Sequence, residues 1–412
     1  MADRKVAFLL VGGGLAAANC ARSLRQAGAD GSIVLVGREP DLPYERPPLS
    51  KGYLRGTETR ADALVRGADF YEQHEIEVLT RTSAMKLDLA ARTVRLSNKQ
   101  ELEFEQLLLA TGANVRRLNV PGLELEGIHY LRTFANADGI REDAAGKRVV
   151  LIGGSYIAAE VAASLTELGS NCSLVMLEPV VLSRHFGPEA ARFLHDVLED
   201  HGIVIYGDDE LERFEGADGR VTRVVTKAGR ELEADAVIVG AGVTPDVMLA
   251  RAAGLELGET GGVRVDALLE TAVHGVFAAG DVAEYESVLH GGRRIRVEHW
   301  DVAFNHGKTA ALNMLGRGVD YDVVPYFFSD LSDWAAIEYV GPAYEWDTEV
   351  VRGSPEEGAF TVFYLDRGRL AGALSVGRSE DLGHARRLIS SGTQLGERAP
   401  ELGDLSSSLE DL

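Results

Sequence analysis

Two segments of the chain follow the same plan, and this repetition constrains the fold more than any other feature. Residues 5–39 read KVAFLLVGGGLAAANCARSLRQAGADGSIVLVGRE, and residues 147–178 read KRVVLIGGSYIAAEVAASLTELGSNCSLVMLE. Each segment runs from an apolar strand through a glycine turn and an alanine-rich helix to a second apolar strand that ends in an acid. A unit of about 30 residues in this order is a right-handed βαβ crossover with two parallel strands. The sequence therefore predicts an α/β fold in which this unit occurs twice.

The glycine turn of the first unit has the pattern that binds a dinucleotide. Gly12, Gly14 and Ala17 give G-x-G-x-x-A directly after the first strand. The first position permits a tight turn, the second lets a pyrophosphate approach the backbone, and the small third residue lets the helix pack on the strand. Glu39, at the end of the second strand, is the acid expected to bind an adenosine ribose. Its neighbour Arg38 either lies along the adenine or points to water, and the sequence leaves both open.

The turn of the second unit departs from this pattern at one position. Gly153 and Ala158 match it, but Ser155 replaces the middle glycine. The Cβ of Ser155 crowds the approach of a pyrophosphate, while its hydroxyl can donate to a phosphate oxygen, so we expect this turn to bind NADH more weakly. Glu178 ends the second strand and favours NADH over NADPH, because a carboxylate accepts from a ribose hydroxyl and repels a 2′-phosphate. The first cation after it is Arg184, and the alternative for Glu178 is a solvated acid at a strand end.

Further short apolar strands predict how the chain is divided. LLLATGA and AVIVGAG read as short buried strands that end in small residues, and GVFAAGDVAE gives a further apolar strand that ends at Gly280-Asp281. We expect two Rossmann-like domains, the second inserted into the first, followed by a smaller α+β C-terminal domain. The pattern changes at Pro325 to aromatic hairpins, one of which turns at Asp366-Arg367-Gly368, then a helical stretch. The expected domains are 1–114 with 246–325, then 115–245, and then 326–412, whose acidic tail from Glu397 is expected to be poorly ordered.

Composition excludes several classes of function. The formal net charge of −22 over 412 residues argues against a nucleic-acid partner. Cys20 and Cys172 form no disulfide framework and suit a reducing cytoplasm. Glycines interrupt the apolar N-terminus, which favours a strand and helix over a signal peptide, and no run reaches the ~20 apolar residues of a membrane span. The histidines, including His299 and His306, lack the spacing of a metal site, so we expect no metal.

The chain resembles the FAD-dependent ferredoxin–NAD reductases, a group within the glutathione-reductase-like flavoproteins that also includes apoptosis-inducing factor. The motifs LPYERPPLSK, LLLATGA, YLRT, IGGSYIAAE, GDV, RVEHW and PYFFSDL occur in the family's order and cover the chain to about residue 390. The resemblance implies that 1–114 with 246–325 bind FAD and that 115–245 bind NADH. It also implies a pair of catalytic residues beside the flavin, Lys51 near N5 and Glu160 holding that lysine. The alternative for Glu160 is an acid on a helix surface.

The resemblance also implies further cofactor contacts. Phe328 stands where many relatives have Trp, so shielding of the flavin is expected to differ here. The residues expected to bind FAD or NADH, besides those of the two glycine turns and the two strand-end acids, are Arg46, Lys51, Ala84, Arg132, Glu160, Gly242, Asp281, Glu298, His299, Trp300 and Phe328.

These features together predict an NADH-dependent flavoprotein that passes single electrons to a small [2Fe–2S] ferredoxin serving a P450 or Rieske oxygenase. Without a redox disulfide, the electrons are expected to leave directly from the flavin. The alternatives are an NADH oxidase or quinone reductase, and a redox-responsive interaction protein like apoptosis-inducing factor. We expect a cytoplasmic monomer or homodimer that binds neither nucleic acid nor membrane.

Overall fold

The computed structural model describes residues 2–342 and 345–412, which form two compact units. Unit 1 comprises Met1–Glu45, Ala61–Asn114 and Thr244–Pro325. Unit 2 comprises Arg46–Arg60, Val115–Val243 and Tyr326–Leu412. The segment Arg46–Arg60 thus packs with unit 2 although it follows the first βαβ unit in sequence. The strands β7 (Ala113–Val115) and β16 (Val243–Pro245) lie where the chain passes from one unit to the other.

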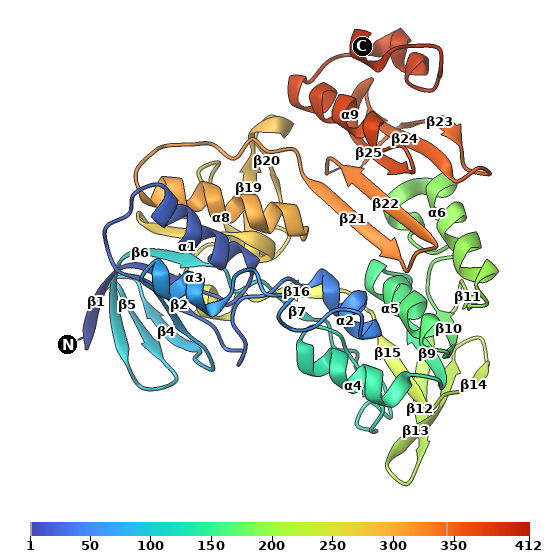
Figure 1. Ribbon diagram of the computed structural model, residues 1–412, viewed down its shortest axis with the longest axis horizontal. Coiled ribbons are helices and arrows are strands. Elements are labelled where there is room, and N and C mark those ends of the chain that lie inside the picture. The colour runs from blue at the N-terminus through green and yellow to red at the C-terminus, as the bar shows by residue number, and fades with distance from the viewer. Residues whose placement is uncertain (1, 343–344) are drawn as a thin grey trace. The chain divides into compact units, whose positions relative to one another are not determined.

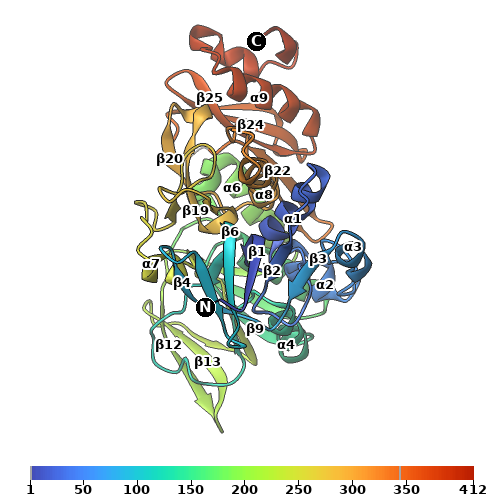
Figure 2. The same cartoon turned by 90° about the vertical axis from the view of Figure 1, so that its left-hand side faces the viewer.

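The main sheet of unit 1 has the strand order β3-β2-β1-β6-β5-β4, with β18 paired to β6. The strands β1, β2, β3, β6 and β18 are parallel, while β5 runs antiparallel to both β4 and β6. Figure 2 shows β1, β2 and β6 side by side. The elements of this unit are β1 (Arg4–Val11), α1 (Leu15–Gln26), β2 (Ile33–Val36), α3 (Ala68–Gln73), β3 (Ile76–Leu79), β4 (Ala84–Asp88), β5 (Thr93–Leu96), β6 (Glu101–Leu109), α7 (Met248–Ala252), β17 (Val263–Arg264), β18 (Val276–Ala278), η2 (Gly280–Val282), β19 (Ala283–Ser287), η3 (Val288–His290), β20 (Arg293–Ile295) and α8 (Trp300–Met314).

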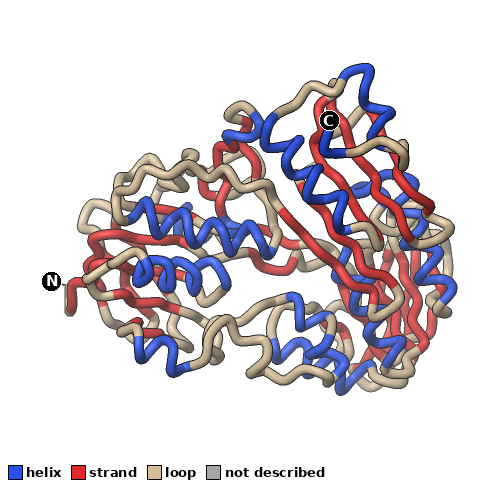
Figure 3. The backbone as a smooth tube through the Cα atoms, turned by 45° about the horizontal axis from the view of Figure 1, so that its top comes forward, coloured by secondary structure: helices blue, strands red, loops and turns tan. Residues whose placement is uncertain are grey.

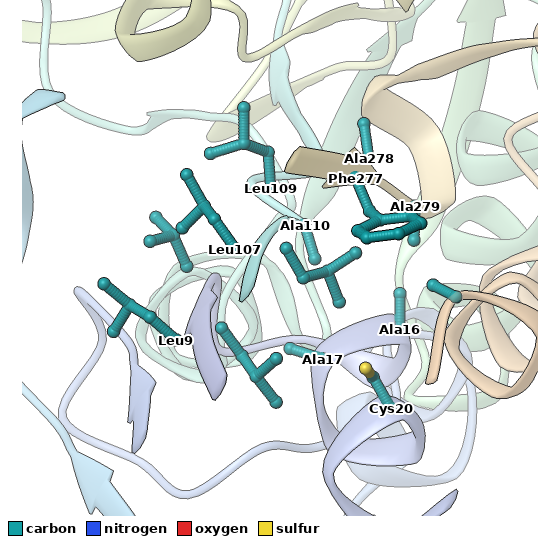
Figure 4. Packing of buried hydrophobic residues seen from close by; sticks show 14 of the residues in the cluster. Leu9, Ala16, Ala17, Cys20, Leu107, Leu109, Ala110, Phe277, Ala278 and Ala279 are labelled. Carbon is teal, nitrogen blue, oxygen red and sulfur yellow. The ribbon is translucent and has the colours of Figure 1, made fainter. Parts of the chain in front are cut away.

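Small side chains let two helices of unit 1 pack closely. The alanines of α1 face the leucines of β6 across the core, and Cys20 lies among them (Figure 4). The helices α1 and α8 lie side by side (Figures 1 and 3). A Cβ at Gly307 of α8 would lie 2.3 Å from the carbonyl oxygen of Ala16, closer than real atoms approach. Glycine at this position therefore fixes how closely α8 lies against α1, at the end of α1 that carries the glycine turn.

Unit 2 holds the second βαβ unit in a parallel five-stranded sheet of order β11-β10-β9-β15-β8. An antiparallel sheet, β12-β13-β14, accompanies it. These elements are η1 (Pro47–Ser50), α2 (Gly52–Arg55), β8 (Ile128–His129), α4 (Phe134–Ala144), β9 (Arg148–Ile152), α5 (Tyr156–Glu167), β10 (Asn171–Val175), α6 (Ser183–Asp200), β11 (Val204–Tyr206), β12 (Leu211–Ala217), β13 (Arg220–Thr226), β14 (Glu231–Glu233) and β15 (Ala236–Val239). Both βαβ units therefore have the parallel strands that their sequences predict.

The C-terminal part of unit 2 is an antiparallel sheet of order β21-β22-β25-β24-β23 with α9 packed on it (Figure 3). The predicted turn between β24 and β25 is present, with Arg367 and Gly368 at φ values of 50° and 76°. Its elements are β21 (Tyr326–Leu331), β22 (Ala335–Val340), β23 (Thr348–Ser354), β24 (Ala359–Asp366), β25 (Arg369–Val376), α9 (Ser379–Ser391), η4 (Gly396–Leu402) and η5 (Leu409–Asp411). The predicted fold class, α/β with a smaller α+β part, is confirmed.

The prediction of a poorly ordered tail is wrong. Leu402, Leu409 and Leu412 are buried, with exposed fractions of 0%, 4% and 8%. The guanidinium of Arg352 on β23 donates to the carbonyl oxygens of Leu402, Asp404 and Ser407 at 3.3, 2.5 and 3.2 Å. The acidic composition hid this arrangement, because a few leucines spaced along a polar segment anchor it when a sheet offers them a surface. In the described part of the chain, no helix combines the length and apolar character needed to cross a membrane.

Candidate functional site

The turn between β1 and α1 leaves its backbone open at the start of the helix. Gly12 has a φ of 138°, and a Cβ there would lie 2.0 Å from the carbonyl oxygen of Ala110. A Cβ at Gly14, by contrast, would meet no atom within 4 Å. Gly14 is also the N-cap of α1, and no described side chain caps the helix there. An uncapped helix start with open space before it fits a phosphate, which binds to such free N–H groups.

The acid predicted to bind a ribose lies beside this turn. Glu39 follows β2, and its carboxylate accepts a hydrogen bond from the hydroxyl of Tyr44 at 2.5 Å. Arg38 is half exposed and makes two polar contacts. Its guanidinium donates to Asp246 at 3.0 Å and to Asn114 at 2.6 Å, both within unit 1. Arg38 therefore fastens the strand end next to Glu39.

The second glycine turn uses its serine differently from the first. Gly153 has a φ of 115°, and a Cβ there would lie 2.5 Å from the carbonyl oxygen of Gly240. Ser155 is the N-cap of α5, and its hydroxyl accepts from the N–H of Ala158 at 3.4 Å. The same hydroxyl donates to the carbonyl oxygen of Gly240 at 3.0 Å. The one hydrogen of this hydroxyl thus joins α5 to the end of β15.

Glu178 lies close to the same turn and is paired. Its Oε1 lies 2.8 Å from Nε of Arg184, and 18% of its side chain is exposed. A Cβ at Gly154 would lie 3.6 Å from the other carboxylate oxygen. The alternative of a freely solvated strand-end acid is therefore wrong. A carboxylate beside the glycine turn fits an adenosine ribose, and Arg184 is a cation within reach of the same place.

A buried ion pair lies at the far end of the segment IGGSYIAAE. Lys51, the N-cap of α2, pairs with Oε1 of Glu160 on α5, and their side chains are only 10% and 5% exposed. The alternative of Glu160 as a surface acid is therefore wrong. Asp330 on β21 is half-buried nearby; burial raises the pKa of its carboxyl, and the ammonium of Lys51 opposes that rise. A buried charge pair is costly unless its remaining polar atoms are also satisfied.

Two serines that the sequence pattern did not single out donate hydrogen bonds to the Glu160 carboxylate. Ser50 donates to Oε2 of Glu160 at 2.5 Å, and Ser329 on β21 donates to Oε1 at 2.5 Å. Both lie inside quoted motifs, RPPLSK and PYFFSDL, but a serine in a motif carries no signal of which group its hydroxyl meets. The partner of each hydroxyl is set by the packing of η1 and β21 against α5.

The remaining predicted residues lie in both units. In unit 2, Arg46 donates to the carbonyl oxygen of Arg132 at 2.5 Å, which joins two of the predicted FAD contacts. Gly242 follows β15 with a φ of 86°, and Phe328 lies on β21. In unit 1, Ala84 begins β4, Asp281 lies in η2 and Glu298 pairs with Arg296. His299 is the N-cap of α8, and Trp300 is its first residue.

Two side chains of α8, His306 and Trp300, carry buried ring nitrogens. His306 on α8 is fully buried, and its Nδ1 accepts from the N–H of Gly280 at 3.2 Å. Burial lowers the pKa of His306 to about 3, so its ring stays neutral. The indole N–H of Trp300 is buried and has no hydrogen-bond partner among the described residues. A buried donor without a partner beside the predicted flavin contacts fits a polar ligand atom at this place.

The cysteines offer no redox pair. Cys20 and Cys172 are both free and buried. Burial raises the pKa of both thiols, that of Cys172 to about 11. Protonated, enclosed thiols are poor nucleophiles.

Two glycine turns, each with a strand-end acid nearby, have the geometry of dinucleotide-binding turns. The chain belongs to the pyridine nucleotide-disulphide oxidoreductase family, whose model matches residues 6–307. A second model, described as reductase C-terminal, matches residues 326–412.

Individual relatives are similar over nearly the whole chain. The ferredoxin–NAD(+) reductase component of the anthranilate 1,2-dioxygenase system of Burkholderia cepacia is 37% identical over 387 residues, 93% of this chain and 94% of that protein. Apoptosis-inducing factor 3 of Homo sapiens is 31% identical over 404 residues, 98% of this chain and 66% of that protein. The covalent putidaredoxin reductase–putidaredoxin complex contains a chain 31% identical, with a TM-score of 0.93 over 100% of this chain and 98% of that one.

These findings confirm the predicted class of enzyme. The chain is an NADH-dependent flavoprotein oxidoreductase of the ferredoxin–NAD(+) reductase type, and FAD and NAD(H) are the cofactors of this family. The glycine turns described above fit both cofactors.

Proposed function

We propose that the protein takes electrons from NADH and passes them singly to a small [2Fe–2S] ferredoxin that serves a P450 or Rieske oxygenase. The buried Lys51–Glu160 pair carries this proposal, because Glu160 lies on the helix that begins at the second glycine turn. The relatives support the acceptor: one is a ferredoxin–NAD(+) reductase component of a dioxygenase system, and another is a reductase joined to putidaredoxin.

The two cofactors are assigned to different parts of the chain. We propose that residues 1–114 and 246–325 bind FAD, that 115–245 bind NADH, and that 326–412 form the C-terminal domain. The open helix start at Gly14 supports the first assignment, and the Glu178 carboxylate beside Gly154 supports the second. The further contacts proposed for FAD are Arg46, Ala84, Arg132, Asp281, Glu298, His299, Trp300 and Phe328, and those proposed for NADH are Gly153, Ser155, Glu160, Glu178 and Gly242.

The protein's own groups then have distinct roles. Bound FAD would supply the redox chemistry that links the two-electron donor NADH to a one-electron acceptor. The ammonium of Lys51 stabilises negative charge on the reduced cofactor, and the carboxylate of Glu160 keeps that ammonium in place. Because Cys20 and Cys172 are free and buried, no thiol pair lies on the electron path. Buried thiols also suit a reducing compartment, which supports a cytoplasmic location.

The test is NADH-dependent reduction of cytochrome c with and without a panel of [2Fe–2S] ferredoxins. We expect the rate to rise steeply with at least one added ferredoxin and to fall when Glu160→Gln replaces the wild-type protein. Reduced flavin that reacts rapidly with oxygen or a quinone, and with no ferredoxin, would show instead that the protein is an oxidase or quinone reductase.

A second candidate function follows from the similarity to apoptosis-inducing factor 3. In that case the redox state of the flavin would control binding or assembly, and turnover would be incidental. Slow reduction by NADH, a long-lived reduced complex with NAD, and a change in oligomeric state by sedimentation would support this candidate. Fast turnover with ferredoxin and an unchanged monomer or homodimer would exclude it.

A further inference from the structure

Donors from two sequence-distant segments of unit 2 converge on one carboxylate. Ser50 and Lys51, at the end of η1, and Ser329, on β21, all bond to Glu160. Ser329 shares Oε1 with the lysine, while Ser50 binds Oε2. Both hydroxyls are buried, since Ser50 and Ser329 are only 1% and 3% exposed. Each oxygen of the carboxylate is thus held by a neutral hydroxyl from a different side.

The Ser50 side chain is itself held in place. Its hydroxyl lies 2.5 Å from Glu160 but 3.2 Å from the carbonyl oxygen of Pro47, so the carboxylate takes the hydrogen. Ser164, one turn beyond Glu160 on α5, donates to the backbone carbonyl of Ser50 at 2.6 Å. The guanidinium of Arg55 donates to the Ser164 hydroxyl at 3.2 Å. The residue that orients Glu160 is therefore tied back to the same helix.

We propose that Ser50 and Ser329 are positioning residues that fix the carboxylate of Glu160 and, through it, the ammonium of Lys51. The proposal rests on the proposed function of the Lys51–Glu160 pair. A carboxylate bound only by the lysine could rotate about its terminal bond and draw the ammonium with it. Hydroxyls on both oxygens prevent that rotation, because turning the group breaks two charge-assisted hydrogen bonds. One of these hydroxyls comes from the C-terminal sheet, so that sheet helps to position the Lys51–Glu160 pair.

The experiment compares alanine and threonine at each serine in the FAD-loaded protein. Stopped-flow reduction by NADH gives the limiting rate constant and the half-saturating NADH concentration. We expect Ser50→Ala and Ser329→Ala each to lower the limiting rate constant about tenfold while leaving the half-saturating concentration within about twofold. Ser50→Thr and Ser329→Thr keep the hydroxyl and should restore most of the rate.

A matched control separates this role from general loss of a buried hydroxyl. Ser375 on β25 is 1% exposed in the same sheet as Ser329, and its hydroxyl accepts from the backbone N–H of Arg378 at 3.2 Å. Ser375→Ala should leave the limiting rate constant unchanged. In the Glu160→Gln background, Ser329→Ala should add less than about a twofold effect, because two residues that act through one group are not additive.

The midpoint potential of the bound flavin provides a readout that needs no turnover. The serine O–H dipoles offset the negative charge of Glu160, so removing either one should move the potential to more negative values. Ser375→Ala should leave the midpoint potential unchanged. If Ser329→Ala fails to fold, Ser50→Ala decides the proposal by the same two measurements.

Three results would overturn the inference. The first is full additivity of the rate effects of Ser329→Ala and Glu160→Gln, the second is a change in NADH affinity alone, and the third is an equal loss of the limiting rate constant in Ser375→Ala.

Neither the rate of reduction by NADH nor the midpoint potential depends on an electron acceptor. A wild-type protein that is reduced by NADH but passes nothing to ferredoxins would contradict the proposed acceptor and leave the serine test intact. If NADH does not reduce the wild-type protein, the proposed function fails, and an unchanged midpoint potential in the two alanine variants then overturns the positioning role as well.

Discussion

Ser155 occupies the position where the first turn has Gly14, and its hydroxyl joins the start of α5 to the carbonyl oxygen of Gly240. Ser155→Ala removes both the helix cap and this link, so we expect a loss of about 1 kcal/mol of stability in the free energy of unfolding. Chemical denaturation measures that loss. The hydroxyl is already bonded within the protein, so the dissociation constant of NADH should change little in Ser155→Ala.

Two comparisons complete this prediction. Thr133→Ala removes an equivalent cap from α4, where the side chain accepts from the N–H of Asn136 at 3.2 Å, and it should cost about the same stability. Ser155→Gly removes the Cβ as well and should tighten NADH binding if that atom crowds the pyrophosphate. An unchanged dissociation constant in Ser155→Gly would rule out the crowding.

Coenzyme choice is also a residue-scale property, because Glu178 and Arg184 pair beside the second turn. Glu178→Ala removes the carboxylate that repels a 2′-phosphate and releases a guanidinium that can bind one. We expect the ratio of kcat/KM for NADPH over NADH to rise about tenfold or more, measured by steady-state kinetics. The double variant with Arg184→Ala should lose that gain, and a double variant that keeps it would show that Arg184 has no part in binding NADPH.

At the scale of elements, the guanidinium of Arg352 holds the first part of the C-terminal tail, while Arg387 of α9 donates to the carbonyl oxygens of Leu409 and Glu410 further on. Arg352 is 7% exposed and donates to three carbonyl oxygens of η4 and the segment after it. Arg352→Ala removes one donor from each of those carbonyls and should loosen the tail, at a cost of about 1–3 kcal/mol. Limited proteolysis should then cut after residue 395 well before the rest of the chain. Arg367→Ala is the control, since that side chain is 89% exposed, and equal protection of the tail in both variants would contradict the prediction.

Elements were predictable where a local pattern and its tertiary environment agree. The strand–turn–helix–strand order of both βαβ units and the turn at Arg367-Gly368 follow from apolar runs and glycine positions, and they are present. The tail was mispredicted because its few leucines are too sparse to give a period. Their burial depends on a surface formed by β23 and α9, which lie earlier in the chain.

At the scale of the whole molecule, the stability of unit 1 should depend on the neutral form of His306. Burial lowers its pKa from 6.5 to about 3. Between these pH values the unfolded chain binds a proton that the folded protein does not, so stability is full above about pH 6.5 and falls as the pH falls toward about 3. This contribution has a slope of at most about 1.4 kcal/mol per pH unit.

His306→Gln tests that dependence. A glutamine can accept from the N–H of Gly280 but does not titrate, so its free energy of unfolding should fall less steeply between pH 6.5 and 3 than that of the wild-type protein. Denaturant titrations at a series of pH values measure the difference. His274→Gln, at a side chain that is 94% exposed, should keep the wild-type slope. Parallel slopes for His306→Gln and the wild-type protein would contradict the prediction.

The sequence by itself determined the two βαβ units, the glycine turns and the acids that follow them, because these features are local and depend on spacing along one segment. It also pointed, through resemblance, to Lys51 and Glu160. Only the tertiary structure decided where the hydroxyls and guanidiniums go. Ser155 turns to Gly240, while Ser50 and Ser329 meet on Glu160. A side-chain donor selects whichever acceptor the folded chain brings within about 3 Å, and that choice is made by elements distant in sequence.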